Sequence, residues 1–387
     1  MSTELNITYD KSVSALLRER ISAGDFPSAV YLVAARGEVM MADALGDAVR
    51  EPEHHPASLD TIYDLASLTK PLVTGLLTAL FVERNELRLD AAVSYYFSEF
   101  SPTAQSTISI GQLLTHTSGL PAWRPLYIIT GGERERTLSV IAEQPLEYAP
   151  GTRVLYSDLG FSTLGLIIEK ITGASLAEVA RREIFEPLAL SRTLFNPPPE
   201  MQREVAASES AGNAYEREMC ADDDDLRQAM ISREWRAHPI WGEVHDGNAH
   251  FLGGAAGHAG LFSTAQEVCS IARQFLAGST ELLVPRTCAL FRTNMTEGLN
   301  EARSFGWQLA ATQDSTAGPA LAPDSFGHLG FTGTSCWIDS ARERIFVLLT
   351  NRTHAHSLPF VNINGVRRSF HTLASAALNR INSAGEK

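Results

Sequence analysis

Strand-like patterns lie near both ends of the chain, and helical patterns fill the middle. Near the amino end, "SAVYLVAARGEVMMADALG" (residues 28–46) predicts two strands joined by a turn at Gly37. Near the carboxyl end, "FGWQLA", "FGHLGFTGTSCWIDS" and "RIFVLLTNR" have the same character. If the two regions pair in one antiparallel sheet, the helical middle must be an insertion between them. This order of elements constrains the fold more than any other feature.

Helical periodicity completes this prediction. It indicates helices at residues 11–21, 110–117, 134–144, 157–185 and 366–381. The predicted fold class is therefore α/β (α+β), with an antiparallel β-sheet flanked by amino- and carboxyl-terminal helices. We expect residues 1–66 and 258–387 to form a discontinuous sheet domain and residues 67–257 a mostly helical inserted domain. A site would lie in the cleft between the two.

Composition excludes several classes of partner. The 387 residues are 44% hydrophobic and carry a formal net charge of −13, with no cluster of Lys and Arg. Proteins that bind nucleic acid or anionic lipid need such clusters, so we expect neither a nucleic acid nor a membrane partner. The amino terminus has no basic leader followed by an apolar run, which predicts a cytoplasmic protein. Nothing in the sequence specifies an oligomeric state.

Two groups of residues are expected to have structural roles only. The four cysteines are scattered without a C-x-x-C, so we expect buried, reduced thiols. The acidic run at residues 222–225 is expected to be a solvated loop.

The stretch "DLASLTKPLVTG" (residues 64–75) could carry chemistry. Pro71 cannot lie deep inside a helix, so the helix through Phe81 must begin close to Ser67. Ser67 and Lys70 then share one helix face. A serine hydroxyl needs an adjacent base, and a lysine can serve if its pKa is lowered. Alternatively, both are ordinary first-turn residues.

Two further stretches could contribute. In "VLYSDLGF", Tyr156 could relay a proton beside a lysine, or it could pack beneath a helix capped by Ser157 or Asp158. The Gly-rich segment "HLGFTGTS" could offer an amide to an oxyanion, or its small residues could only permit tight packing.

The three elements, in this order and at these separations, resemble the serine β-lactamase and penicillin-binding-protein superfamily, above all class C β-lactamases and family VIII carboxylesterases. The S-x-x-K motif is matched by Ser67 to Lys70, Y-x-N by Tyr156 to Asp158, and K-T-G by His328 to Gly330. The stretches "LLTHTSGLP" and "GHAGLFST" are also similar to that branch. The resemblance covers residues from about 10 to about 380.

Two positions depart from the family pattern. Asp158 replaces the asparagine of Y-x-N, and its charge would keep Lys70 protonated unless the side chain turns away, which favours Tyr156 as the base. His328 replaces the lysine that would hold a β-lactam or peptide carboxylate, and it is mostly neutral at pH 7. This second change favours a substrate without that carboxylate.

The resemblance implies a role for each matched residue. Ser67 would be the acylated nucleophile, and Lys70 and Tyr156 would handle its proton. The amides of Ser67 and Phe331 would bind the oxyanion. The residues expected to line the substrate site are Asp158, His328, Gly330, Trp123 and His258. Trp123 and His258 could equally be packing residues.

The expected function is that of a serine hydrolase, most of all a carboxylesterase for small esters. The alternative is an amidase or peptidase acting on cell-wall fragments or D-amino-acid peptides, with weak β-lactamase activity. A non-catalytic binding protein is disfavoured by the intact Ser67, Lys70 and Tyr156 set.

We expect no cofactor and no metal. His245, Asp246, His250 and His258 fall within fourteen residues, but they lack the H-E-x-x-H spacing, so a loop that closes over the pocket is preferred to a metal site.

Overall fold

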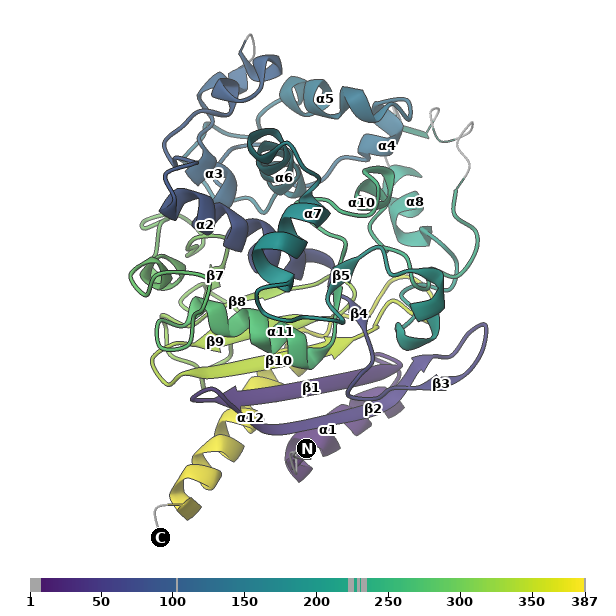
Figure 1. Cartoon of the computed structure of the whole chain (residues 1–387). Helices are drawn as coiled ribbons and strands as arrows, with labels where there is room; N and C mark the ends of the chain where they lie inside the picture. The colour runs from purple at the N-terminus through teal and green to yellow at the C-terminus, as the bar shows by residue number, and fades with distance from the viewer. Residues whose placement is uncertain (1–7, 102–103, 222–225, 228–229, 231–234, 386–387) are drawn as a thin grey trace.

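The computed structural model describes residues 8–101, 104–221, 226–227, 230 and 235–385. Its centre is a seven-stranded sheet in the order β3-β2-β1-β10-β9-β8-β7, with every neighbouring pair antiparallel (Figure 1). The strands are β1 (Ser28–Ala35), β2 (Glu38–Val49), β3 (His55–Pro56), β7 (Gln308–Leu309), β8 (Phe326–Leu329), β9 (Ser335–Asp339) and β10 (Arg344–Thr350).

The two ends of the chain meet in the middle of this sheet. Strand β1 pairs with β10 in a continuous register from Ala29 opposite Thr350 to Ala35 opposite Arg344. Both strands are buried almost throughout, since helices cover both faces of the sheet. The prediction of one antiparallel sheet built from both ends is confirmed.

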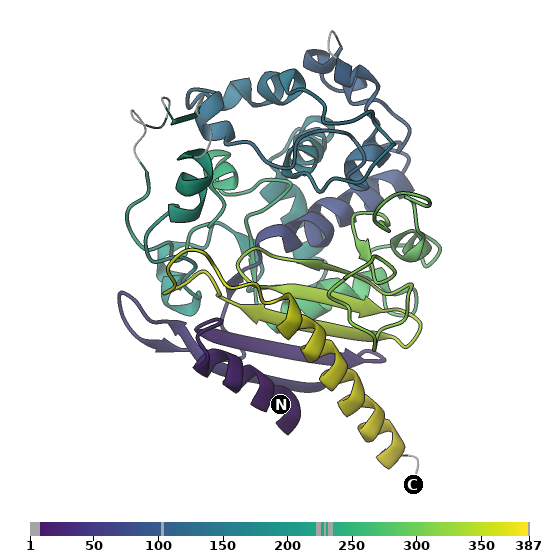
Figure 2. The same cartoon turned by 180° about the vertical axis from the view of Figure 1, so that it is seen from behind.

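Terminal helices cover one face of the sheet, as predicted. Helices α1 (Lys11–Ser22) and α12 (Asn364–Gly385) pack against each other and against β2 and β10 (Figure 2). Asp10 caps α1 by accepting hydrogen bonds from the amides of Ser12 and Val13. On the opposite face, α11 (Ala265–Ala272) packs against β1, β9 and β10.

The middle of the chain is mostly helical, and its helices lie above the sheet and α11 in Figure 1. Its helices are α2 (Leu76–Glu83), α3 (Ile110–Leu114), α4 (Leu126–Ile129), α5 (Thr137–Glu143), α6 (Asp158–Thr172), α7 (Leu176–Ala180), α8 (Ala214–Ala221) and α10 (Gly247–Phe251). The helix predicted over 157–185 is two helical segments, because α6 ends at Gly173, which has a left-handed φ of 68°. The helical segment Leu176–Phe185 lies at 76° to α6.

A second, three-stranded sheet was not predicted. It has the order β4-β6-β5 and consists of β4 (Tyr63–Asp64), β6 (Leu261–Ser263) and β5 (Leu194–Phe195). Strand β4 leads directly into the turn that holds Ser67, so this small sheet fixes the start of the site.

The fold class is thus the predicted one, while the domain boundaries remain a prediction. All four cysteines are buried, and none forms a disulfide within the part of the chain that the structure describes. The acidic run at 222–225 lies outside the described residues. Within the described ranges, no single helix has the length and apolar composition needed to cross a membrane. Asp158–Thr172 and Leu176–Phe185, taken together as one bent pair, meet the test by length and composition only.

Candidate active site

A strained turn places Ser67 at the start of a helix. Ser67 lies in the 3-10 turn Ala66–Leu68, which continues through the π-helical segment Lys70–Gly75 into α2. Ala66 has a φ of 47°, in the left-handed region that alanine rarely adopts. Its amide donates to Asp64 Oδ1 at 2.8 Å, which stabilises this conformation. Such local strain is typical of functional sites.

Lys70 lies directly behind Ser67 and is fully buried. Its Nζ donates to Ser67 Oγ at 3.0 Å and to the carbonyl of His258 at 2.9 Å, and it lies 2.6 Å from Asp158 Oδ1. Burial lowers the pKa of Lys70, but the Asp158 carboxylate and the Tyr156 hydroxyl together outweigh burial, so this pKa is above its ordinary value. Lys70 is therefore an ammonium at neutral pH.

The start of α6 separates the roles of two neighbouring residues. Ser157 caps the helix, because its side chain accepts from the amide of Gly160. Asp158 does not turn away from the site, since its carboxylate forms the ion pair with Lys70. The first-turn position of Asp158 thus directs its charge at Lys70.

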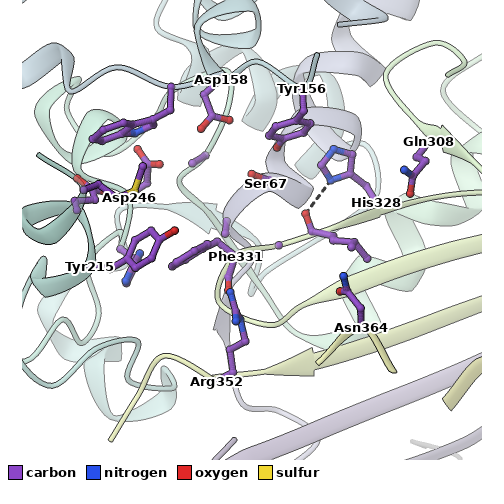
Figure 3. Close-up of a pocket in the computed structure, with 18 of the residues that line it drawn as sticks. Ser67, Tyr156, Asp158, Tyr215, Asp246, Gln308, His328, Phe331, Arg352 and Asn364 are labelled. Atoms are coloured by element: carbon purple, nitrogen blue, oxygen red, sulfur yellow. Dashed lines mark hydrogen bonds between the residues drawn. The ribbon is translucent and has the colours of Figure 1, made fainter. Parts of the chain in front are cut away.

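Tyr156 is buried beside Ser67 and Lys70. Lys70 Nζ lies 4.8 Å from the centroid of the Tyr156 ring. The Tyr156 hydroxyl points toward Ser67 in Figure 3, and it interacts with the side chains of Ser67 and Lys70. Burial raises the pKa of Tyr156, although the Lys70 cation opposes the rise. The ring packs between His116, at 4.6 Å between centroids, and His328, at 5.7 Å.

Strand β8 brings His328 to the same pocket. Its Nδ1 donates to the carbonyl of Leu329 at 2.9 Å, so in the neutral imidazole Nε2 carries the lone pair. Burial, together with the charges of Arg303 and Lys70, holds the pKa of His328 well below its ordinary value. His328 is therefore neutral at pH 7, as predicted.

Gly330 is required by close packing at the end of β8. A Cβ on Gly330 would lie 2.0 Å from Thr334 Oγ1 and 2.5 Å from the carbonyl of Leu65. Thr334 Oγ1 in turn donates to the Leu65 carbonyl at 3.0 Å. The end of the strand is thus fastened to the turn that precedes Ser67.

Ser67 and Tyr156 line a cavity of about 470 Å³, whereas Lys70, behind Ser67, is not among its lining residues. The predicted site residues that line it are Ser67, Trp123, Tyr156, Asp158, His328, Gly330 and Phe331. The His258 side chain does not line this cavity, which corrects the prediction of substrate contact. It is buried between Ser162 Oγ and Asp246 Oδ1, each at 2.9 Å, and His258 serves the site through its carbonyl on Lys70.

The predicted loop around His245 is partly helix α10, and two of its residues, His245 and Asp246, line the cavity. His245 Nε2 pairs with Glu209 at 2.6 Å, and His250 Nε2 lies 3.5 Å from Glu243. In the described part of the chain, no three His, Cys, Asp or Glu side chains form a group that could hold a metal ion.

Several lining residues were not expected from the sequence. They are Ala66, Tyr215, Glu216, Met219, Ala259, Arg303, Gln308, Leu329, Arg352, Asn364 and Arg367. Most come from segments without a motif, and only the folded chain brings them together. His116 was part of the quoted "LLTHTSGLP" stretch, but nothing in that stretch indicates that its ring packs on Tyr156.

The sequence profile of the Beta-lactamase family matches residues 13–365. The chain belongs to this family. A relative from Escherichia coli (strain K12), named "Putative D-alanyl-D-alanine carboxypeptidase", is 30% identical over 378 residues, covering 90% of this chain and 84% of the relative. A relative of the same name from Salmonella agona is 31% identical over 382 residues, with the same coverage.

Solved structures of the family share the fold. "EstCE1, a hydrolase with promiscuous acyltransferase activity" superimposes with a TM-score of 0.71 at 24% identity, covering 93% of this chain and 97% of that one. A "Beta-Lactamase/D-Alanine Carboxypeptidase" from Pseudomonas syringae superimposes with a TM-score of 0.72 at 17% identity, with the same coverage. The resemblance to the β-lactamase and penicillin-binding-protein superfamily is confirmed, and the protein is a hydrolase of that fold.

Proposed function

We propose that this protein is a serine carboxylesterase that hydrolyses small esters through an acyl-Ser67 intermediate. The observation that carries the proposal is the contact of Ser67 Oγ with Lys70 Nζ at 3.0 Å beside the buried Tyr156, whose hydroxyl interacts with both groups. A nucleophile, a fixed cation and a proton-accepting group then meet at one wall of a cavity large enough for a small ester.

Proton transfer in this proposal follows from the raised pKa values of Lys70 and Tyr156. Lys70 stays an ammonium because of Asp158, so it stabilises negative charge on Ser67 Oγ and does not accept its proton. Tyr156, in its ionised form, takes the proton as Ser67 attacks the carbonyl, and it then returns that proton to the leaving group. The amides of Ser67 and Phe331 would stabilise the oxyanion. Water releases the acyl group in the second half of the cycle.

A second candidate is hydrolysis of an amide in cell-wall fragments or D-amino-acid peptides. The names of the Escherichia coli and Salmonella relatives favour it, as does the presence of Asn364 and Arg367 in the cavity lining. The neutral His328 favours the ester, because it supplies no charge for a carboxylate at this strand.

The nucleophile can be tested by intact-protein mass. With a fluorophosphonate or p-nitrophenyl butyrate, the wild type should gain one adduct at Ser67, and Ser67→Ala should gain none and lose turnover. Ser157→Ala is the poorer choice of control because Ser157 caps α6, so Ser335→Ala, at a buried serine of β9, serves instead. An adduct that persists in Ser67→Ala would overturn the assignment.

A further inference from the structure

The Lys70 ammonium is held on Ser67 by two further acceptors. Its Nζ lies 2.6 Å from Asp158 Oδ1 and donates to the carbonyl of His258 at 2.9 Å, in addition to Ser67 Oγ at 3.0 Å. An ammonium has three N–H donors, so two fixed acceptors determine the direction of the third donor. The position of the His258 carbonyl therefore affects how well Lys70 contacts the nucleophile.

The His258 carbonyl belongs to a turn that has almost no side chains. In the segment 253–260, "GGAAGHAG", every residue except His258 is glycine or alanine. Thr74 Oγ1 donates to the carbonyl of Gly257 at 2.7 Å and so fixes the preceding peptide. The direction of the next carbonyl depends on the backbone rotation at His258 itself. The ring of His258 is the only side chain of this segment that is large enough to fix that rotation.

The His258 ring is fully buried and is bonded at both nitrogens. Its Nδ1 lies 2.9 Å from Ser162 Oγ on α6, and its Nε2 lies 2.9 Å from Asp246 Oδ1 at the start of α10. Burial would raise the pKa of Asp246, but the contacts with His258 and the Ala249 amide oppose this effect, and the pKa is below its ordinary value. An ionised carboxylate only accepts hydrogen bonds, so Nε2 donates to it. The ring is thus held between two helices.

Ser162 also connects two of the groups that hold Lys70. Its Oγ donates to the carbonyl of Asp158, one helical turn earlier in α6, at 2.9 Å. The contacts form a closed circuit, in which Ser162 joins the Asp158 backbone to the His258 ring, and Lys70 completes the circuit on the other side. In such a network the loss of one bond affects the others. Ser162 is not among the residues that line the cavity, so it acts from behind the site.

We propose that Ser162 and Asp246 are positioning residues, which hold the His258 carbonyl so that the ammonium of the adjacent lysine stays on the nucleophile during its attack. This inference rests on the proposed function, in which Lys70 stabilises negative charge on Ser67 Oγ. Without the two bonds to the ring, the carbonyl can turn away, and the ammonium moves toward its carboxylate partner, which is the stronger acceptor. The contact with Ser67 then weakens, while the cavity that binds the ester keeps its shape.

The first test removes the hydroxyl of Ser162. Alanine is a good helix former, so Ser162→Ala should not weaken α6 itself. Its kcat for p-nitrophenyl butyrate and its limiting rate of fluorophosphonate labelling should each fall about tenfold, with KM within about twofold of wild type, because the lost bond acts on the attack and not on binding. Ser162→Thr keeps the hydroxyl and should restore both rates to within about threefold of wild type. Ser270→Ala is the matched control and should change neither rate, since Ser270 Oγ on α11 also donates to the carbonyl four residues earlier.

The second test separates the two bonds of Asp246. Its Oδ1 accepts from the Ala249 amide, as the cap of α10, and from the His258 ring. Serine is also a favoured cap residue but is too short to reach the ring, whereas asparagine keeps an oxygen for both bonds. Asp246→Ser should therefore lower kcat and labelling about tenfold, and Asp246→Asn should stay within about threefold of wild type. Asp10→Ser, at the cap of α1, is the matched control and should change neither rate.

A double-mutant cycle tests whether Ser162 acts through the ring. His258→Gln keeps a donor directed at Asp246 but loses the bond to Ser162. Adding Ser162→Ala to this variant should change the labelling rate by less than about twofold, because the bond is already absent. A further loss of about tenfold would show that Ser162 acts independently of His258, which would overturn the inference.

The outcomes separate this inference from the proposed function. If Ser162→Ala and Asp246→Ser are labelled at the wild-type rate, the positioning inference is wrong and the acyl-Ser67 proposal stands. If Ser67 of the wild type is not labelled, the proposed function itself fails. Should His258→Gln fail to fold, the comparison of alanine with threonine at position 162, and of serine with asparagine at position 246, decides the question. Equal losses within either pair would contradict the inference.

Discussion

Asp158 influences the protonation of both Lys70 and Tyr156. A carboxylate 2.6 Å from Lys70 Nζ makes the ammonium the stable form of that side chain. Lys70 then has three acceptors for its three N–H groups, namely Asp158, Ser67 and the His258 carbonyl. An asparagine at position 158 would allow Lys70 to lose a proton more easily. The aspartate that this chain has there therefore favours Tyr156 as the base.

A tyrosine base with a raised pKa predicts a particular pH profile. The ionised fraction of such a group rises about tenfold for each pH unit below its pKa, and burial places the pKa of Tyr156 above its ordinary value of 10. With a neutral ester, kcat/KM should therefore rise steadily from pH 6 to pH 9 without a plateau. Tyr156→Phe should lower kcat/KM by on the order of 10² to 10⁴ and abolish the slope.

The control for this experiment is Tyr148→Phe. The Tyr148 hydroxyl donates to the His116 carbonyl and does not line the cavity, so its removal should preserve the slope. A plateau below pH 8 in wild type, or an unchanged profile in Tyr156→Phe, would return Tyr156 to the role of a packing residue.

At the scale of elements, the sequence predicted those whose pattern is long. Helix α1, strands β1 and β2, and helix α12 each extend over enough residues to show a period, and each was predicted close to its bounds. Strands β4 and β5 have two residues each, so no period can be detected, and the second sheet was missed. The break at Gly173 was also missed, because apolar residues continue on both sides of it.

The same limit applies to the site. Ser67, Lys70 and Tyr156 lie in recognisable motifs, and their convergence could be expected from them. Glu216 and Arg303 lie in stretches without a motif, and only the packing of α8 and the segment before β7 against the cavity brings them to the wall. His258 lies in a motif, yet its side chain faces away because Ser162 and Asp246 bind both ring nitrogens.

The residue His328 on strand β8 predicts a preference for a neutral ester over a penicillin. A neutral His328 cannot hold a carboxylate by charge, so kcat/KM for p-nitrophenyl butyrate should exceed that for benzylpenicillin by on the order of 10². His328→Lys should narrow this ratio, and His54→Lys, at an exposed histidine, should not. Equal or greater efficiency on benzylpenicillin in the wild type would contradict the interpretation of this strand.

At the scale of the whole molecule, the fold depends on the two ends of the chain being together. Strand β1 is bonded to β2 on one side and to β10 on the other, so the sheet is incomplete until the last strand is present. Helices α1 and α12 then pack side by side, and Arg380 Nη2 lies 2.8 Å from Asp10 Oδ2. The two ends of the described chain are thus neighbours.

This proximity predicts that the chain can be circularly permuted. Joining residue 387 to residue 1 and opening the chain between Gly131 and Gly132 should give a folded protein that is still labelled at Ser67, because both glycines are exposed and Asp10 already pairs with Arg380. Opening the same joined chain between Leu32 and Val33 should abolish soluble protein and labelling, since that cut divides the buried strand β1. Circular dichroism and fluorophosphonate labelling measure both outcomes. A folded, labelled protein from the cut in β1 would show that the pairing of β1 with β10 is not what holds the two ends of the chain together.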